Sequence, residues 1–126
     1  MSAAKRWAEA YERAWLAGDG EVAGSLYADD CEFRSSPFRE LEDARAYMLR
    51  VFAEAEAREV WFAEPVEHDD RAAVEYWALL VEPDGTEETL AGCHVIRFGE
   101  DGLVAAARDY WHVEAGHRRP PDGWGR

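Results

Sequence analysis

Residues 86–113 read TEETLAGCHVIRF, then GEDG, then LVAAARDYWHV. The first and third segments are rich in apolar, β-branched and aromatic residues, and the four residues between them are types that favour tight turns. This stretch predicts a β-hairpin with strands Thr86–Phe98 and Leu103–Val113. Two segments of similar character, Val60–Val66 and Ala72–Val81, precede it, and a turn at Pro83-Asp84-Gly85 separates them from the hairpin. We therefore expect an antiparallel meander in the second half of the chain.

The first half of the chain has the periodicity of helices. Apolar residues from Trp7 to Trp15 recur every three or four positions, which predicts one helix ending at Gly18, and Asp19 is placed to cap a short second helix. The further expected elements are that second helix, burying Val22, Ala23, Leu26 and Tyr27; a strand Cys31–Arg34; a loop at Ser35-Ser36-Pro37; and a third helix marked by Leu41, Ala44, Met48, Val51, Phe52 and Ala55. Helices followed by an antiparallel sheet predict an α+β fold.

The chain is strongly acidic. It has 126 residues, with 27 Asp and Glu against 14 Lys and Arg, and a formal net charge of −13. Such a body repels phosphate backbones and anionic membrane surfaces, so we expect neither nucleic acid nor a membrane as a partner. The N-terminal residues carry charges throughout without an apolar h-region, and Cys31 and Cys93 lack a CxxC neighbour. Together these features favour a cytoplasmic protein with two reduced thiols.

The final hairpin brings a histidine and a carboxylate together. If Phe98 faces Leu103 across the four-residue turn, His94 lies opposite Ala107 and diagonal to Asp109, on the same face of the sheet. Diagonal neighbours have Cα atoms roughly 7–8 Å apart, so their side chains can meet. An odd number of loop residues would place the two side chains on opposite faces.

His94 and Asp109 are our candidate acid–base pair. Asp109 lies between Ala107 and Trp111 on an apolar wall, where burial raises the pKa of a carboxyl group. We also expect the carboxylate to raise the pKa of His94, since each charge favours the other. An acid–base pair on an apolar wall is typical of proton-transfer chemistry. The residues alone favour the structural alternative somewhat, a His–Asp hydrogen bond inside a packed core or two residues at a wet sheet edge, because ion-pair networks also perturb pKa values. No metal-ligand or nucleotide-binding spacing accompanies the pair, so we expect no metal and no cofactor.

The strand Ala72–Val81 predicts apolar residues on both faces of the sheet. One side carries Val74, Tyr76, Ala78 and Leu80, and the other carries Trp77, Leu79 and Val81 together with Glu75. One face must cover the helices, and the second would be a large exposed apolar patch, which usually marks an interface. We therefore expect a homodimer through the sheet. The loop at residues 83–85 does not fix which face His94 shares.

The last residues, Gly116–Arg126, form a separate tail. Two prolines and three glycines prevent it from continuing a helix or a central strand. We expect a single domain over residues 1–115, followed by this tail over residues 116–126. The tail has three Arg and one Asp, a charge of +2 that leaves −15 on the rest. We expect Trp124 to dock on the acidic body.

Three short motifs indicate a family. Ala17-Gly18-Asp19, Leu26-Tyr27-Ala28-Asp29-Asp30 and Arg108-Asp109-Tyr110-Trp111, in this order and spacing, resemble the nuclear-transport-factor-2-like superfamily, and most closely the SnoaL-like polyketide cyclases and their bacterial relatives. The resemblance covers about Ala4 to Val113. It implies a cone-shaped fold in which a curved sheet wraps the first helix, a hydrophobic pocket between them, and dimers through the sheet.

The resemblance also implies roles for individual residues. His94 and Asp109 match the pair that serves the acid–base step of aldol ring closure in SnoaL-like cyclases. Tyr11 matches the oxyanion-hole tyrosine of ketosteroid isomerases, whereas Ser35 stands at their catalytic base, where a hydroxyl cannot replace a carboxylate. In limonene-epoxide hydrolases an Asp–Arg–Asp triad holds the water, and only its last member is kept here, as Asp109. Glu75 and Trp77 stand at the other two positions, which implies that both face the pocket.

These observations lead to two hypotheses about function. In the first, His94 and Asp109 act without a cofactor on a carbonyl compound, by aldol cyclisation, isomerisation or dehydration. Tyr11 then donates to a developing oxyanion, and the other expected binding residues are Trp15, Ser35, Glu75, Trp77 and Trp111. In the second, the chain is a ligand-binding or dimerisation module without chemistry. The sequence names neither a substrate nor a reaction.

Overall fold

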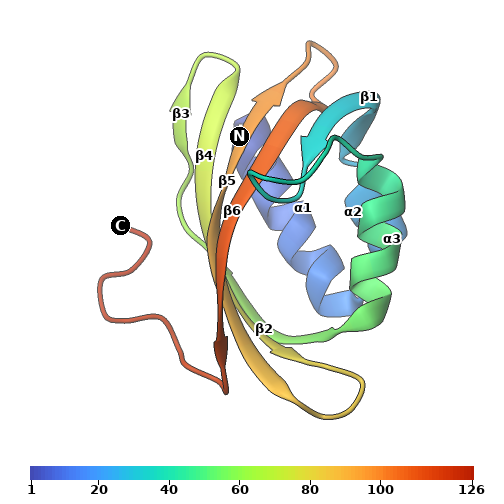
Figure 1. Ribbon diagram of the computed structural model, residues 1–126. Coiled ribbons are helices and arrows are strands. Elements are labelled where there is room, and N and C mark those ends of the chain that lie inside the picture. The colour runs from blue at the N-terminus through green and yellow to red at the C-terminus, as the bar shows by residue number, and fades with distance from the viewer.

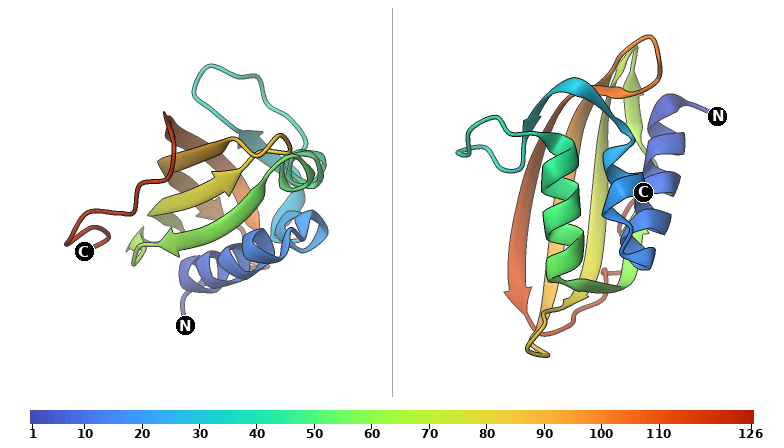
Figure 2. Two further views of the ribbon diagram at one scale, coloured as in Figure 1. Left: turned by 90° about the horizontal axis from the view of Figure 1, so that it is seen from below. Right: turned by 90° about the vertical axis from the view of Figure 1, so that its right-hand side faces the viewer.

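The computed structural model describes residues 1–126 and has three helices on the concave side of one curved sheet (Figure 1). The elements are α1 (Ala3–Ala17), α2 (Gly20–Gly24), β1 (Tyr27–Arg34), α3 (Ala44–Glu54), β2 (Glu56–Phe62), β3 (Val66–His68), β4 (Arg71–Val81), β5 (Glu87–Phe98) and β6 (Val104–Ala115). The strands pair in the order β1-β6-β5-β4-β2, and β3 also pairs with β4. Only β1 and β6 run parallel. Helices α1 and α3 lie across the hollow side of the sheet (Figure 2), which confirms the predicted α+β cone.

Helix α1 closes the cone with the apolar stripe predicted for it. The Ser2 side chain accepts a hydrogen bond from the Lys5 backbone N–H, and Gly18 ends the helix in the left-handed conformation with φ 67°. Trp7 and Tyr11 are buried and pack on Phe62 of β2. The main core therefore lies between the helices and the inner face of the sheet. No helix is both long and apolar enough to span a bilayer.

The boundaries of α2 and α3 differ from the predicted ones. β1 begins at Tyr27, so α2 ends before Leu26 and Tyr27, and Val22 within α2 is exposed instead of buried. The Asp43 side chain accepts hydrogen bonds from the first backbone N–H groups of α3, so Leu41 precedes the helix and is exposed. Both helices are shorter than their apolar spacing suggests. The start of β1 limits the C-terminal end of α2, and the Asp43 cap fixes the N-terminal end of α3.

The predicted strand Val60–Val66 is two strands. β2 begins earlier, at Glu56, and pairs with one end of β4, whereas the short β3 pairs with the other end of β4. The two strands thus share one edge of β4. Between them, the Ala63 backbone N–H donates to the Glu75 carbonyl at 2.9 Å.

A β-bulge sets the register of the β5–β6 hairpin. Phe98 pairs with Val104 and Arg97 pairs with Ala106, so Ala105 is an extra residue in β6. His94 is consequently the direct partner of Asp109. The predicted diagonal relationship is wrong, because Leu103 belongs to the turn and the bulge shifts the pairing, but both side chains still share one face. Buried Val104 takes the inner-face place expected for Leu103.

The pairing of β4 with β5 settles which face of β4 lines the hollow. Val74 pairs with His94 and Tyr76 pairs with Gly92, so Tyr76 shares the inner face with His94. Glu75 and Trp77 alternate with these residues and lie on the outer, convex face. The pocket position implied for Glu75 and Trp77 is therefore wrong. The C-terminal residues run across the outer side of the sheet (Figure 1).

Candidate functional site

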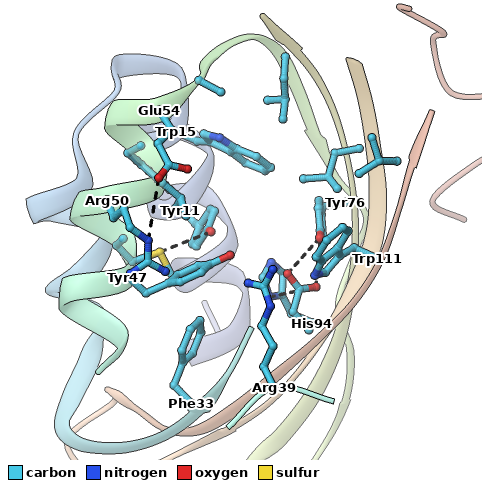
Figure 3. Close-up of a pocket in the computed structure, with 18 of the residues that line it drawn as sticks. Tyr11, Trp15, Phe33, Arg39, Tyr47, Arg50, Glu54, Tyr76, His94 and Trp111 are labelled. Atoms are coloured by element: carbon cyan, nitrogen blue, oxygen red, sulfur yellow. Dashed lines mark hydrogen bonds and ion pairs between the residues drawn. The ribbon is translucent and has the colours of Figure 1, made fainter. Parts of the chain in front are cut away.

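A cavity of about 360 Å³ lies between the helices and the inner face of the sheet (Figure 3). One wall comes from α1 and α3, and the other from β4, β5 and β6. Aromatic side chains dominate the lining, among them Tyr11, Trp15, Tyr47, Phe52, Tyr76 and Trp111. Small-molecule sites are typically apolar clefts of roughly 300–1,000 Å³ with a few polar groups, and this cavity has that character.

The polar groups on the sheet wall centre on Asp109. The Tyr76 hydroxyl lies 3.0 Å from each Asp109 carboxylate oxygen and donates to the carboxylate. His94 Nδ1 lies 3.9 Å from Asp109 Oδ1, which is too long for a hydrogen bond. The His94 and Tyr76 rings pack with centroids 4.7 Å apart. Three neighbouring strands therefore place a carboxyl, a phenol and an imidazole side by side.

Burial controls the protonation of this cluster. Burial raises the pKa of Asp109 to about 7, although the hydrogen bonds from Tyr76 and from the Tyr110 backbone N–H oppose the shift. Burial also lowers the pKa of His94 to about 3, because the ring is 3% exposed and no hydrogen bond compensates its charge. The expectation that Asp109 raises the pKa of His94 is therefore wrong. Near neutral pH, His94 is uncharged, and Asp109 is divided between its acid and carboxylate forms.

Two tyrosines face this cluster from the helical wall. The hydroxyls of Tyr11 on α1 and Tyr47 on α3 point into the cavity (Figure 3). The Tyr11 hydroxyl has only a weak acceptor, Met48 Sδ at 3.6 Å. Burial raises the pKa of both phenols, so both remain hydrogen-bond donors at neutral pH. The Tyr11 ring lies 5.5 Å from the His94 ring, and the charge of Asp109 adds to the effect of burial in raising the pKa of Tyr11.

The rim beside Trp111 is organised by Ser35. The Ser35 backbone carbonyl accepts a hydrogen bond from Trp111 Nε1 at 2.7 Å. Its hydroxyl donates to Glu42 at 3.1 Å and accepts from Arg39 at 3.0 Å. The Arg39 guanidinium in turn lies 5.9 Å from the centre of the Trp111 ring. Ser35 is fully buried behind the cavity wall and orients two of the residues that form the opening.

The structure brings together five of the eight predicted site residues. Tyr11, Trp15, His94, Asp109 and Trp111 all line the cavity. Ser35 lies behind the wall, and Glu75 and Trp77 lie on the opposite face of the sheet.

Tyr76 is the contact that sequence reasoning missed. It is the direct hydrogen-bond partner of Asp109. Both faces of β4 carry apolar residues, so the sequence of β4 does not show whether Tyr76 or its neighbours Glu75 and Trp77 share the face of His94. The number of residues in the 83–85 turn decides this, and it is the one signal in the sequence that could have identified Tyr76.

The architecture is that of the nuclear-transport-factor-2-like superfamily. The Mycobacterium tuberculosis protein RV0760c is similar with a TM-score of 0.76 and 20% identity, over 92% of this chain and 98% of that one. The Δ5-3-ketosteroid isomerase from Mycobacterium sp. gives 0.71 and 19%, over 89% and 95%. SalBIII, an epoxide hydrolase/cyclase-like enzyme with a role in pyran ring formation in salinomycin, gives 0.72 and 14%, over 89% and 95%.

Within this class, the sequence profile of the SnoaL-like domain matches residues 8–107. The chain belongs to the SnoaL-like domain family. Its similarity to the solved structures is similarity of fold, since all three identities are low. No curated protein matches the sequence.

Proposed function

We propose that this protein binds a small apolar carbonyl compound in the cavity and catalyses proton transfer on it without a cofactor. The observation that carries the proposal is the Asp109 carboxyl group in the wall of an aromatic cavity, hydrogen-bonded to Tyr76 and with its pKa raised by burial to about 7, while Tyr11 lines the same cavity. A general acid–base group is most effective when its pKa is near the working pH.

In this mechanism Asp109 on the sheet wall transfers the proton, and Tyr11 on the helical wall stabilises the developing charge. The Asp109 carboxylate takes a proton from the carbon next to the carbonyl, and the electron pair of that C–H bond moves toward the carbonyl oxygen. The Tyr11 hydroxyl donates a hydrogen bond to this oxygen as its charge develops. Protonated Asp109 then returns the proton to carbon or to oxygen. Tyr76 holds the carboxyl group in position, and neutral His94 completes the polar wall.

The aromatic lining of the cavity favours a ligand with apolar rings. Aromatic side chains stand on both the helical and the sheet walls, and the lining also includes Arg39, Arg50, Glu54 and Glu82 in addition to His94 and Asp109. A ketosteroid isomerase and a cyclase-like enzyme of polyether formation share this fold, which supports chemistry on ring systems. Whether the outcome is cyclisation, isomerisation or dehydration depends on the compound bound.

A pocket that binds without turnover is the competing function, and a hydrogen-exchange experiment distinguishes the two. β-Tetralone, a two-ring ketone, is incubated with the protein in D2O, and NMR follows loss of its α-hydrogens. We expect exchange above the buffer rate, reduced by roughly 10²–10⁴ in Asp109→Asn and less in Tyr11→Phe.

Glu75→Gln, on the outer face, is the matched control and should exchange like the wild type. Saturable perturbation of cavity resonances by the ketone without accelerated exchange would establish a binding module instead.

A further inference from the structure

The C-terminal tail follows a defined path across the outer face of the sheet. The Thr89 hydroxyl donates to the Gly116 carbonyl at 2.7 Å and accepts from the Arg118 backbone N–H at 2.9 Å. One strand over, Trp77 Nε1 donates to the Arg118 carbonyl at 2.7 Å. The path crosses from β5 over β4, and three hydrogen bonds to outer-face side chains fix the backbone of the tail.

The tail then reaches β2 through side-chain contacts. Arg119 pairs with Glu59 at 3.1 Å and lies 5.2 Å from the centre of the Trp61 ring. Trp124 packs edge-on against Trp77, with ring centroids 6.1 Å apart. Each aromatic residue that β2 and β4 present on this face therefore has a partner in the tail.

The outer face beneath the tail carries a mostly apolar patch. We define the outer patch as Trp61, Trp77, Leu79 and Thr89. Leu79 pairs with Thr89 on one side and with Glu59 on the other, so it lies directly under the path of the tail. Leu79 and Thr89 are each only 4% exposed, although they lie on the convex side of the sheet, away from the core. The tail excludes water from this patch.

Charge also matches the tail to the outer patch. Residues 116–126 carry +2, and the rest of the chain carries −15. Beyond the Arg119–Glu59 pair, His117 Nδ1 lies 3.5 Å from Glu87, and His117 Nε2 lies 2.8 Å from the Leu80 carbonyl. A basic segment with a tryptophan thus lies on the outer patch, in contact with Glu59 and Glu87.

We propose that the outer patch is a docking surface for a short, basic, tryptophan-containing segment, which this chain covers with its own tail. By covering it, the tail keeps the apolar residues of β2 and β4 from pairing with a second copy of the chain. The tail is an exchangeable occupant, held by a few hydrogen bonds and two aromatic contacts. When it leaves, a second copy of the chain takes its place, and a free peptide of the tail sequence competes with that copy.

The test uses the full chain with its tail released. In Arg119→Glu/Trp124→Ala, one change repels Glu59 and the other removes the contact with Trp77. NMR hydrogen exchange of the Trp77 indole N–H reports the bond to the Arg118 carbonyl, and we expect exchange about tenfold faster or more in this variant. The Trp111 indole N–H, bonded to Ser35 on the cavity side, should not change.

Sedimentation velocity and a peptide complete the test. We expect the released variant to form larger species than the wild type as its concentration is raised. Addition of the free peptide GHRRPPDGWGR should reverse this and restore the protection of Trp77. Arg126→Ala, at the exposed end of the tail, is the control and should behave as the wild type.

A charge-swap variant tests whether the effect of Arg119→Glu comes from the lost ion pair and not from unfolding. Glu59→Arg combined with Arg119→Glu, with Trp124 retained, should recover the protection of Trp77. Unchanged Trp77 exchange in the released variant, unchanged sedimentation, or no effect of the peptide would each overturn the proposal.

Discussion

His94, which is buried, and Asp109, whose side chain is 14% exposed, are adjacent groups with opposite pKa shifts. Burial favours the neutral form of each, which for Asp109 is the protonated form and for His94 the deprotonated form. Each residue therefore makes stability depend on pH, and the two dependences have opposite signs. Because the two pH ranges overlap, the two contributions to the free energy of unfolding largely cancel in the wild type.

Variants that remove one partner should reveal the other. For Asp109, the folded pKa of about 7 exceeds the ordinary 3.8, so its contribution to stability is present at low pH and is lost as pH rises through 7. For His94, the folded pKa of about 3 is below the ordinary 6.5, so its contribution is present above pH 6.5 and is lost as pH falls.

As pH rises from 4 to 7, the stability of Asp109→Asn should therefore increase relative to that of the wild type. The stability of His94→Gln should decrease relative to the wild type over nearly the same range. Each effect is on the order of 4 kcal/mol at most. Urea unfolding at a series of pH values measures both. Parallel stability curves for the wild type and the two variants would contradict the assigned burial.

Tyr76 should control the pKa of Asp109 directly. Its hydroxyl bonds both carboxylate oxygens and so stabilises the charged form. In Tyr76→Phe we expect the pKa of Asp109 to rise further above 7, because burial is then less opposed. Carboxyl ¹³C NMR titration measures this shift. Tyr110→Phe removes a phenol from the outer face and should leave the Asp109 midpoint in place; an unmoved midpoint in Tyr76→Phe would mean that the bond does not form.

At the scale of single residues, the sequence predicted the side chains but not their electrostatics. His94, Asp109 and Tyr11 could be selected because strand parity and family motifs identify them. The direction of the His94 shift could not be predicted, because it depends on how completely Trp7, Tyr11 and Tyr76 enclose the ring. Desolvation is a property of the assembled core, and no local pattern reports it.

At the scale of elements, the β5–β6 hairpin shows what a turn can and cannot predict. The residues GEDG placed the hairpin correctly, yet the bulge at Ala105 moved His94 from a diagonal to a direct partner of Asp109. Helix α1 was predicted more accurately, since its apolar stripe and its Gly18 terminus are both local signals. Bulges and the parity of β4 depend on pairing between strands, which is why these features differed.

The absence of a side chain at Gly92 of β5 leaves room for the Tyr76 hydroxyl beside Asp109. A Cβ there would lie 2.7 Å from the Tyr76 hydroxyl and 2.4 Å from the Tyr110 backbone carbonyl. Gly92→Ala should therefore displace Tyr76 from Asp109 and destabilise the fold by about 1–3 kcal/mol. Urea unfolding and the Asp109 titration measure the two effects.

Gly99→Ala is the matched control for this change. Its added Cβ would meet mainly the flexible Asp101 side chain, so we expect a small effect. Equal stability of the Gly92→Ala and Gly99→Ala variants would show that β5 yields easily at Gly92.

At the scale of the whole molecule, the two apolar faces of the sheet have different partners. The inner face covers the core and the cavity, and the tail covers the β2–β4 part of the outer face.

The homodimer through the sheet stays a prediction, now limited to the β5–β6 part, where Tyr110 is 43% exposed. Sedimentation should give twice the 14.3 kDa chain mass, and Tyr110→Glu should reduce it to one chain. A wild-type species of one chain mass would contradict this assembly.

We expect the Asp109 carboxyl group, enclosed in the cone, to titrate near neutral pH, as a group that transfers protons there must. Carboxyl ¹³C NMR titration of the wild-type protein tests this most directly, with the Asp109 signal assigned by its absence in Asp109→Asn. We predict a midpoint near pH 7, set by burial in the aromatic cavity. A midpoint near the ordinary value of 3.8 would rule out Asp109 as the proton-transfer group near neutral pH, because Asp109 would then be a permanently charged, solvated carboxylate.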